Sequence, residues 1–281
     1  MREIEASQIT LTVARLFKDT NYNLTNDVLE ALKQAAQNEE SNAGQEILNQ
    51  IIMNANIAGE GQFPLCQDCG LAVIFLELGQ EVHIRGGDLK TAVNEGVRQA
   101  YGDGYLRKSV VDHPFTGRLN TQDNTPAIVY IDVVPGDKIK ITAMPKGGGA
   151  ENMSRLGMLT PGAGIAGITE FVVKAVDEAG PNACPPLIVG VGIGGTAEKA
   201  LLLAKKALIR KVGDSNPDGE VAQLEKNLLE KINRLGIGPM GYGGRITALA
   251  VHVEVFPSHI ASLPVAVNLN CHSSRHKEAI I

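Results

Sequence analysis

The chain has 281 residues, 44% of them hydrophobic and 20% charged, so it can bury a core without needing disulfides or metals to fold. Acidic residues outnumber basic ones by 31 to 26, which excludes the strong positive charge typical of nucleic-acid-binding proteins. The longest apolar stretches, such as Leu187–Ile193, are far shorter than the ~18 residues that a membrane-spanning helix needs. Four cysteines and an N-terminus without an apolar leader predict a cytoplasmic protein whose thiols stay reduced.

The first sixty residues are predicted to be helical, because their apolar residues recur at helical spacing. Asn26 and Ser41 are suitable N-caps, and Gly59 is a suitable end for the last of these helices. From Leu71 onward the pattern changes to short apolar runs separated by turn residues. The elements predicted for this middle part are paired strands over 71–78 and 81–85, a helix over 89–101, a hairpin of strands 127–134 and 138–144, and a loop over 146–152.

The last part of the chain again combines helices and strands. The elements predicted there are helices over 165–179, 196–212 and 221–235, and strands over 187–193, 246–255 and 265–269. Helices and strands do not alternate strictly, which favours a mixed α/β (α+β) fold over a doubly wound parallel sheet. We therefore predict one domain over 1–281, in which a helical region, 1–60, precedes a mostly antiparallel sheet flanked by helices, 61–281.

Three of the cysteines, Cys66, Cys184 and Cys271, stand beside proline, glycine or asparagine in loop-like settings. Their separations of 118 and 87 residues are too long for a local zinc or ferredoxin motif, so only the tertiary fold could bring them together. One alternative is that they are small buried hydrophobic residues. Another is a redox pair formed by Cys66 and Cys69, but such a motif lies between a strand and a helix, whereas here a predicted strand follows it.

Five segments stand out in chain order: Cys66–Asp68, Tyr105–Val110, Pro145–Asn152, Gly190–Gly195 and Asn268–His276. Together they resemble the class I iron–sulfur fumarate hydratases. The resemblance covers nearly the whole chain and is to the separate alpha subunit of the two-subunit form, which corresponds to the N-terminal domain of the single-chain enzymes. The alpha subunits of L(+)-tartrate dehydratases share these segments, so the resemblance indicates the reaction type more narrowly than the substrate.

The resemblance implies that Cys66, Cys184 and Cys271 hold a [4Fe–4S] cluster. Three thiolates leave one iron with an open position, and that iron can act as a Lewis acid toward a substrate oxygen. Cys69 departs from the family, which usually has threonine at this position. We treat it as a residue that does not bind iron, because a fourth thiolate on the open iron would block catalysis.

The resemblance also implies the substrate-binding residues. Gln67 and Asp68 follow the first cluster ligand and are expected to contact the substrate, with Asp68 as the group that transfers a proton. Arg107 is the expected clamp for a substrate carboxylate, because its planar guanidinium can bind one through two hydrogen bonds. Gly148 and Gly149 belong to a glycine run whose N–H groups could approach an anion. Each of these residues also has an ordinary structural interpretation. Asp68 could cap a turn, Arg107 could be a solvated surface residue, and the glycine run could be an ordinary flexible turn.

Two further signals are weaker. Gly190–Gly195 follows a predicted strand as a dinucleotide-binding loop would, but no acidic residue ends a strand ~20 residues later, so we interpret these glycines as close packing near Cys184. His272 and His276 flank Cys271 and could donate to cluster sulfides or substrate. Of the other histidines, those expected to be structural, because they lie on strand-like segments, are His83, His252 and His259, whereas His113 is left open.

The resemblance implies a partner. In the single-chain enzymes the remaining substrate-binding residues, among them a catalytic threonine and further cationic clamps, come from a C-terminal domain that this sequence does not contain. We therefore expect a fumarate hydratase beta subunit to supply them in an α2β2 heterotetramer that hydrates fumarate reversibly to L-malate. The alternatives are an L(+)-tartrate dehydratase alpha subunit, which would make oxaloacetate, and a non-enzymatic iron–sulfur or zinc protein.

Overall fold

The structure is a computed structural model that describes residues 1–61 and 63–281. Its internal contacts divide the chain into two compact units, each built from separate stretches of sequence. The helical region at the start of the chain is shared between them, since α1 (Ala6–Tyr22) belongs to unit 1 while α2 (Asn26–Asn38) and most of α3 (Asn42–Gly59) belong to unit 2. Unit 1 comprises Met1–Thr25, Ala55–Gly148 and Arg275–Ile281, and unit 2 comprises Asn26–Asn54 and Gly149–Ser274.

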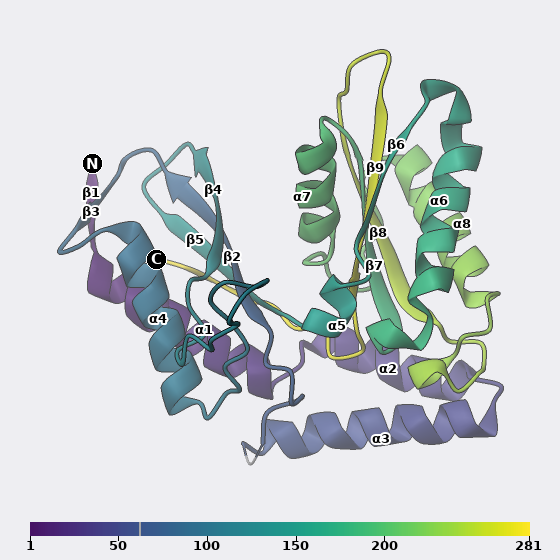
Figure 1. Cartoon of the computed structure of the whole chain (residues 1–281), viewed down its shortest axis with the longest axis horizontal. Coiled ribbons are helices and arrows are strands. Elements are labelled where there is room, and N and C mark those ends of the chain that lie inside the picture. The colour runs from purple at the N-terminus through teal and green to yellow at the C-terminus, as the bar shows by residue number, and fades with distance from the viewer. Residues whose placement is uncertain (62) are drawn as a thin grey trace. The chain divides into compact units, whose positions relative to one another are not determined.

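Unit 1 is a four-stranded sheet, in the order β10-β5-β2-β4, with α1 and α4 packed together over one face (Figure 1). Apolar residues of the two helices, such as Phe17 and Val97, form one core with sheet residues such as Ile74 and Ile141. A separate parallel pair joins β1 to β3. The elements of unit 1 besides the helices already named are β1 (Arg2–Glu5), β2 (Leu71–Gly79), β3 (Val82–Arg85), α4 (Leu89–Asp103), β4 (Ile128–Val134), β5 (Ile139–Lys146) and β10 (Lys277–Ile280).

Two predicted strand pairings in unit 1 are wrong. The strands 127–134 and 138–144 do not form a hairpin, because β2 lies between them and pairs in parallel with β4 and antiparallel with β5. The strand at 81–85 does not pair with its neighbour β2 but with the N-terminal strand β1. Both errors have one cause: β2 has five consecutive buried residues, Ala72–Leu76, so it takes the central position and both of its edges are occupied.

Unit 2 is also built on a four-stranded sheet, in the order β6-β9-β7-β8, with α6 and α8 on one face and α7 on the other (Figure 1). The central strand β7 is buried along its whole length. The elements of unit 2 besides α2 and α3 are α5 (Gly148–Glu151), which starts at the last residue of unit 1, β6 (Arg155–Leu159), α6 (Gly164–Ala179), β7 (Leu187–Gly194), α7 (Ala197–Ala207), α8 (Gly219–Asn233), β8 (Ala248–Phe256), β9 (Leu263–Asn270) and the short 3-10 turns Pro161–Ala163, Gly180–Ala183 and Pro239–Gly241.

The glycines of β7 let α7 lie directly on the strand. A Cβ on Gly190 would come 2.1 Å from the carbonyl oxygen of Ala204, and one on Gly192 would come 2.0 Å from that of Ala200. The predicted close packing of this glycine run is therefore confirmed, but the element packed on it is α7, whereas the prediction placed the packing near Cys184. The mixed α/β class is confirmed as well, and in the described residues four of the seven strand pairings are antiparallel.

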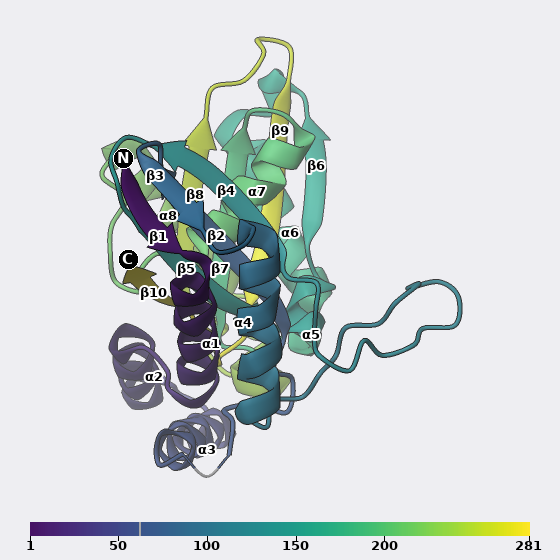
Figure 2. The ribbon, with the colours of Figure 1, turned by 90° about the vertical axis from the view of Figure 1, so that its left-hand side faces the viewer.

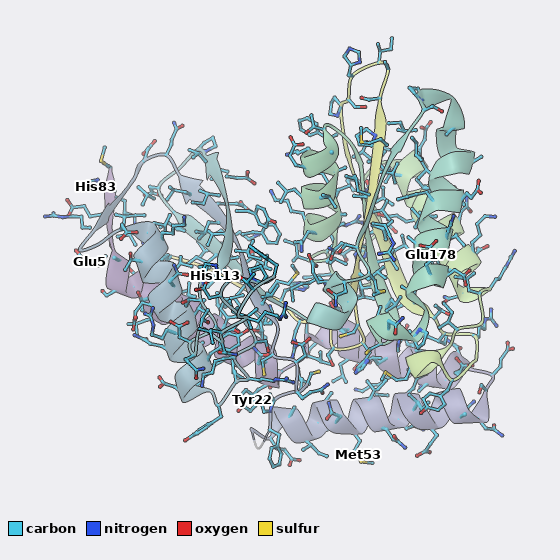
Figure 3. The ribbon with its side chains drawn as sticks, viewed as in Figure 1. Glu5, Tyr22, Met53, His83, His113 and Glu178 are labelled. Atoms are coloured by element: carbon cyan, nitrogen blue, oxygen red, sulfur yellow. The ribbon has the colours of Figure 1, made fainter. Side chains whose placement is uncertain are left out.

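A long connection, residues 104–127, joins α4 to β4 and contains no helix or strand beyond an isolated bridge between Val111 and Asn120 (Figure 2). His113 lies on this connection, while His83 lies on β3 as expected (Figure 3). His259 is not on a strand, because it lies in the exposed loop between β8 and β9. None of the helices in residues 1–61 and 63–281 combines the length and the apolar character needed to cross a bilayer.

Candidate active site

The first predicted cluster ligand, Cys66, lies in unit 1 on the loop that leads into β2. The N–H of Leu65 donates to the carbonyl of Asn21 on α1 at 2.8 Å, which attaches the start of this loop to the core. The N–H of Asp68 lies 3.4 Å from the Cys66 sulfur, and that sulfur also lies 3.4 Å from Oε1 of Gln67. Cys66 is partly exposed, so its thiol can be reached from solvent. An N–H group directed at a sulfur is also the kind of contact that tunes a thiolate bound to iron.

The carboxylate of Asp68 is held by two backbone donors. Oδ1 accepts from the N–H of Gly70 at 3.0 Å, and Oδ2 accepts from the N–H of Gly148 at 2.7 Å. The first bond is the turn-capping contact expected of an ordinary loop aspartate. The second brings the predicted glycine run and the predicted proton-transfer residue together. In unit 1 this run therefore does bind a carboxylate, namely the protein's own.

Tyr101 on α4 holds the end of the same loop. Its side chain is fully buried, and its hydroxyl donates to the carbonyl of Cys69 at 2.6 Å and lies 3.0 Å from that of Gly70. Burial raises the pKa of Tyr101, so the phenol keeps its proton and stays a donor. Gly70 has a positive φ of +76°, and a Cβ there would come 2.7 Å from the backbone nitrogen of Lys146, so only glycine fits this position.

Arg107 reaches this loop through its backbone. Its N–H donates to the sulfur of Cys69 at 3.2 Å, while its side chain is exposed. Asn124 makes a second connection, because its Oδ1 accepts from the N–H of Ser109 at 2.7 Å and its Nδ2 donates to the carbonyl of Gly70 at 3.1 Å. The predicted carboxylate clamp is thus placed beside the loop that carries Cys66, with its guanidinium facing solvent.

Cys69 occupies a different environment from the other three cysteines. It is 2% exposed and belongs to the apolar core of unit 1, where burial raises the pKa of its thiol. Its motif precedes the strand β2 and no helix follows directly, so the context required of a thioredoxin-type redox pair is absent from this described segment. None of the four cysteines, all of which the structure describes, is in a disulfide.

The other two predicted ligands, Cys184 and Cys271, come together in unit 2. Cys184 precedes β7 and Cys271 follows the neighbouring antiparallel strand β9, so both lie at the same end of the sheet. His272 joins them, because its N–H donates to the Cys184 carbonyl at 3.2 Å and its Nδ1 lies 3.1 Å from the same oxygen. Both thiols are partly exposed. Two cysteines 87 residues apart are therefore neighbours through sheet topology.

The polar residues that surround Gly149 in the sequence have structural partners. Glu151 accepts from Nζ of Lys205 at 2.5 Å and from Nδ2 of Asn268 at 3.1 Å, and the same Asn268 nitrogen lies 2.9 Å from the hydroxyl of Ser154. This network fastens α5 to α7 and β9. A Cβ on Gly149 would come 3.2 Å from the carbonyl oxygen of Asn182, so α5 also lies against the turn before Cys184.

The thiols suit the predicted cluster in number and chemistry. Cys66, Cys184 and Cys271 are partly exposed loop residues, and soft thiolate ligands of this kind select iron–sulfur clusters over hard cations such as magnesium. Cys66 belongs to unit 1 and the other two to unit 2, and within the described residues no group of three or more ligating side chains is already assembled. The fourth thiol, that of Cys69, is packed among apolar residues in the core of unit 1.

Sequence reasoning missed three residues of this site: Tyr101, Asn124 and Arg275. Arg275 is 3% exposed and its Nη2 donates to the carbonyl of Asp68 at 2.5 Å, whereas its Nε and Nη1 have no hydrogen-bond partner among the described residues. It lies inside a segment that the resemblance had already singled out, so it could have been found there. Tyr101 and Asn124 carry no such signal.

Known proteins that are similar to this chain belong to one family. A family model described as fumarate hydratase (Fumerase) matches residues 10–280. A protein of Methanocaldococcus jannaschii named "Putative L(+)-tartrate dehydratase subunit alpha" is 45% identical over 273 residues, which are 95% of this chain and 95% of that protein. L(+)-tartrate dehydratase subunit alpha of Escherichia coli strain UTI89 is 33% identical over 96% of this chain and 89% of its own length. The homologous protein of strain K12 is 32% identical over 98% and 91%, respectively.

These matches cover almost the whole chain, so they apply to both units and to all of the cysteines. They confirm the resemblance that the five sequence segments indicated. The names of the relatives as alpha subunits also indicate that a protein of this kind works with a partner subunit. The chain belongs to the class I iron–sulfur fumarate hydratase and L(+)-tartrate dehydratase alpha family, and it is a hydro-lyase.

Proposed function

We propose that this chain is the alpha subunit of a [4Fe–4S] hydro-lyase for four-carbon dicarboxylates, with Cys66, Cys184 and Cys271 as the cluster ligands. The observation that carries the proposal is the difference in burial among the four thiols. The three proposed ligands are partly exposed at loop positions, whereas Cys69 is buried in the apolar core of unit 1. The alternative of a non-enzymatic zinc or iron–sulfur protein loses its support, because the family is one of hydro-lyases.

When bound, such a cluster supplies one iron without a cysteine ligand, which polarises an oxygen of the substrate. The residues of this chain supply the rest of the local chemistry. Asp68, fixed by two N–H groups, holds or moves a proton at its carboxylate next to the first ligand. Arg107 binds a substrate carboxylate through its exposed guanidinium, and Gln67 contributes an exposed amide. Gly148 orients Asp68, and Gly149 allows α5 to approach the Cys184 turn.

Two substrate pairs fit this chemistry. The description of the family model supports reversible hydration of fumarate to L-malate, in which water adds across the double bond. The names of the relatives support loss of water from L(+)-tartrate to give oxaloacetate. Each substrate carries two carboxylates and needs one proton moved at carbon, so the residues named above serve either reaction.

We further propose that a beta subunit completes the site in an α2β2 heterotetramer. The relatives' designation as alpha subunits supports the existence of this partner. The cytoplasm is the proposed location, because cysteines that bind iron have to stay reduced.

The cluster and the partner are tested together. The chain is purified without oxygen, alone and co-expressed with a candidate beta subunit, and iron, labile sulfide and zinc are measured. About four irons and four sulfides per chain with no zinc support the proposal, and activity that requires both chains supports the partner. One zinc per chain, or full activity of this chain alone, contradicts it.

The substrate is tested by comparing kcat/KM for L-malate, fumarate and L(+)-tartrate on the same anaerobic preparation. A preference of about 100-fold or more for one pair identifies the substrate, since a site built to hydrogen-bond a second hydroxyl group discriminates strongly against its absence. If none of the three is turned over while the cluster is intact, the proposed substrate class is wrong.

A further inference from the structure

We propose that Cys69 and Asn124 are positioning residues, which hold the backbone around Arg107 against the Cys66–Gly70 loop. This assigns a role to the fourth cysteine, which stands where the family usually has threonine: it is a hydrogen-bond acceptor and not an iron ligand. The inference rests on the proposed function in one respect, namely that Arg107 binds a substrate carboxylate.

We call the contacts of Cys69 and Asn124 with the Arg107 segment the brace. Its first contact is the bond from the Arg107 N–H to the Cys69 sulfur, with a nitrogen–sulfur distance of 3.2 Å. The Cys69 sulfur is also 3.6 Å from the carbonyl oxygen of Cys66, so one side chain touches both the ligand loop and the arginine segment. Cys69 is 2% exposed and packs in an apolar core, which prevents water from replacing it as the acceptor. The Arg107 N–H therefore depends on this sulfur for a partner.

The second contact is made by Asn124, which is 0% exposed and uses both ends of its amide. Its oxygen accepts from the N–H groups of Ser109 at 2.7 Å and Val110 at 3.3 Å, and its nitrogen donates to the carbonyl of Gly70 at 3.1 Å. One buried side chain thus joins the segment after Arg107 to the end of the ligand loop.

The brace is needed because the segment has no secondary structure to hold it. Residues 104–127 form no helix or strand in the described chain apart from one isolated bridge, and the Arg107 side chain itself is exposed. Leu106 anchors the start of this segment in the core, but without Cys69 and Asn124 the backbone that follows it would lose its bonds to the ligand loop and could shift relative to Asp68. A guanidinium displaced in this way would bind the substrate carboxylate less well, because its paired hydrogen bonds depend on geometry.

A hydroxyl can do the same work as the thiol. Threonine and cysteine both place one hydrogen-bonding atom on Cβ, so a threonine at position 69 would still offer an acceptor to the Arg107 N–H. Alanine would offer none. The brace thus accounts for both cysteine and threonine at this position, which an iron-ligand role for Cys69 does not.

The test is hydrogen exchange of backbone amides in the protein co-purified with its partner subunit, followed by mass spectrometry of peptides that cover 105–111. In Cys69→Ala we expect exchange in this segment to speed up about 3- to 10-fold, the equivalent of one net hydrogen bond, and Cys69→Thr should restore the original rate. Asn124→Gly removes both amide contacts without strain at its φ of +62° and should have the same effect near Ser109. Thr116→Ala, on the exposed middle of the same connection, is the control and should change nothing.

Kinetics separate the brace from the role of Arg107. We expect Cys69→Ala to raise KM about tenfold with kcat altered much less, because a misplaced clamp loses binding to substrate and transition state alike. Faster exchange with an unchanged KM supports the brace and shows instead that Arg107 is not a substrate clamp. Unchanged exchange in both Cys69→Ala and Asn124→Gly overturns the inference, as does loss of iron in Cys69→Thr. If Cys69→Ala does not fold, exchange in Asn124→Gly and iron content in Cys69→Thr still decide.

Discussion

Glu39, between α2 and α3, stabilises unit 2 through an unusual concentration of hydrogen bonds. The side chain is 2% exposed, and its carboxylate accepts four backbone N–H groups. Oε1 accepts from Glu40 at 2.8 Å, Ser41 at 2.9 Å and Arg245 at 2.9 Å, and Oε2 accepts from Ile246 at 2.8 Å. Two segments more than 200 residues apart are thereby joined by one side chain.

Replacing Glu39 by glutamine keeps the shape and removes the charge. Three bonds on the remaining oxygen become neutral, which costs about 1 kcal/mol each, because hydrogen bonds to charged groups contribute more than neutral ones. The new NH2 group then faces the N–H of Ile246, and one buried donor is left unpaired at a cost of about 1–3 kcal/mol. Allowing for local relaxation, we expect Glu39→Gln to lower the free energy of unfolding by about 4 kcal/mol.

The assay is urea denaturation of the purified chain, with thermal unfolding as a second measurement. For a protein of this size the expected loss corresponds to a fall in Tm of about 10 °C. Glu40→Gln is the matched control, since its side chain is 74% exposed and, among the described residues, bonds just to the guanidinium of Arg245 at 2.9 Å. We expect that control to change stability by less than about 0.5 kcal/mol. Equal effects of the two substitutions would refute the reasoning.

The pH dependence gives an independent check on Glu39. Burial alone would raise the pKa of this carboxyl, but the N–H groups of Ser41, Arg245, Ile246 and Glu40 outweigh it and hold the pKa below its ordinary value of 4.5. A carboxyl whose pKa is lowered by folding contributes stability above its unfolded pKa, and that contribution is lost as pH falls through the folded pKa. The difference in stability between the native chain and Glu39→Gln should therefore be constant near neutral pH and shrink below about pH 4.5.

The loss of stability caused by Glu39→Gln should also affect the proposed cluster site. Met240 donates its N–H to the carbonyl of Pro185 at 2.8 Å, and the N–H of Leu187 donates to the carbonyl of Thr247 at 2.9 Å. The segment that Glu39 secures is therefore bonded to Pro185 and Leu187, which directly follow Cys184. We expect Glu39→Gln to retain less iron than Glu40→Gln after anaerobic purification.

Three further predictions concern the sheet of unit 2 and the proposed site. Gly192→Ala should destabilise the chain by about 3 kcal/mol or more in urea denaturation, because its Cβ would lie 2.0 Å from the carbonyl oxygen of Ala200. Gly162→Ala is the control and should be neutral, because its Cβ would meet nothing within 4 Å. Equal stability of the two variants would contradict the packing argument. Asp68→Asn should lower kcat about 100-fold or more if its carboxylate moves the proton, and an unchanged kcat would exclude that role. Arg107→Lys should raise KM about tenfold through loss of bidentate binding, with kcat little altered, and an unchanged KM would exclude Arg107 as the clamp.

Local pattern predicted most of the elements but not how the strands pair. The helices at 89–101, 165–179 and 221–235 were expected within a few residues of α4, α6 and α8, because helical spacing is a property of neighbouring residues. The prediction of a hairpin around the turn 135–137 was wrong, because strand pairing depends on residues that are distant in the sequence. Alternation within 138–141 shows that a strand is half exposed, but which strand lies next to it depends on where the most apolar strand is buried, and that strand is β2.

The missed elements are short and lie at the edges of sheets. β1, β6 and β10 have only four or five residues each, with polar and apolar side chains mixed. They are held largely by backbone hydrogen bonds to a neighbour that is distant in sequence, as β10 is to β5. The predicted loop over 146–152 similarly contains the one-turn helix α5, which is secured by contacts of Glu151 rather than by helical spacing.

The difference between local pattern and long-range contacts also explains why some residues of the site were missed. Tyr101 and Asn124 bond to the carbonyl of Gly70 from 31 and 54 residues away, and nothing in their local sequence indicates that carbonyl as a partner. Cysteines and glycine runs, by contrast, stand out by residue type alone. Motif recognition therefore found the residues that we propose for the chemistry and overlooked two of those that hold their loop in place.

Burial then distinguishes roles among the motif residues themselves. Glu151 and Asn268 belong to the recognised segments, but they bond to each other, and Asn268 is buried, so they are available for structure and not for substrate. Arg107 and Gln67 belong to the same kind of segment, yet both side chains are exposed, and the Arg107 guanidinium makes no hydrogen bond or ion pair within the described residues. We propose that the Arg107 side chain, which is exposed and unpaired while Cys69 holds its backbone, is placed to meet a group outside the chain. In a hydro-lyase of this family, the group that we propose for this contact is a substrate carboxylate.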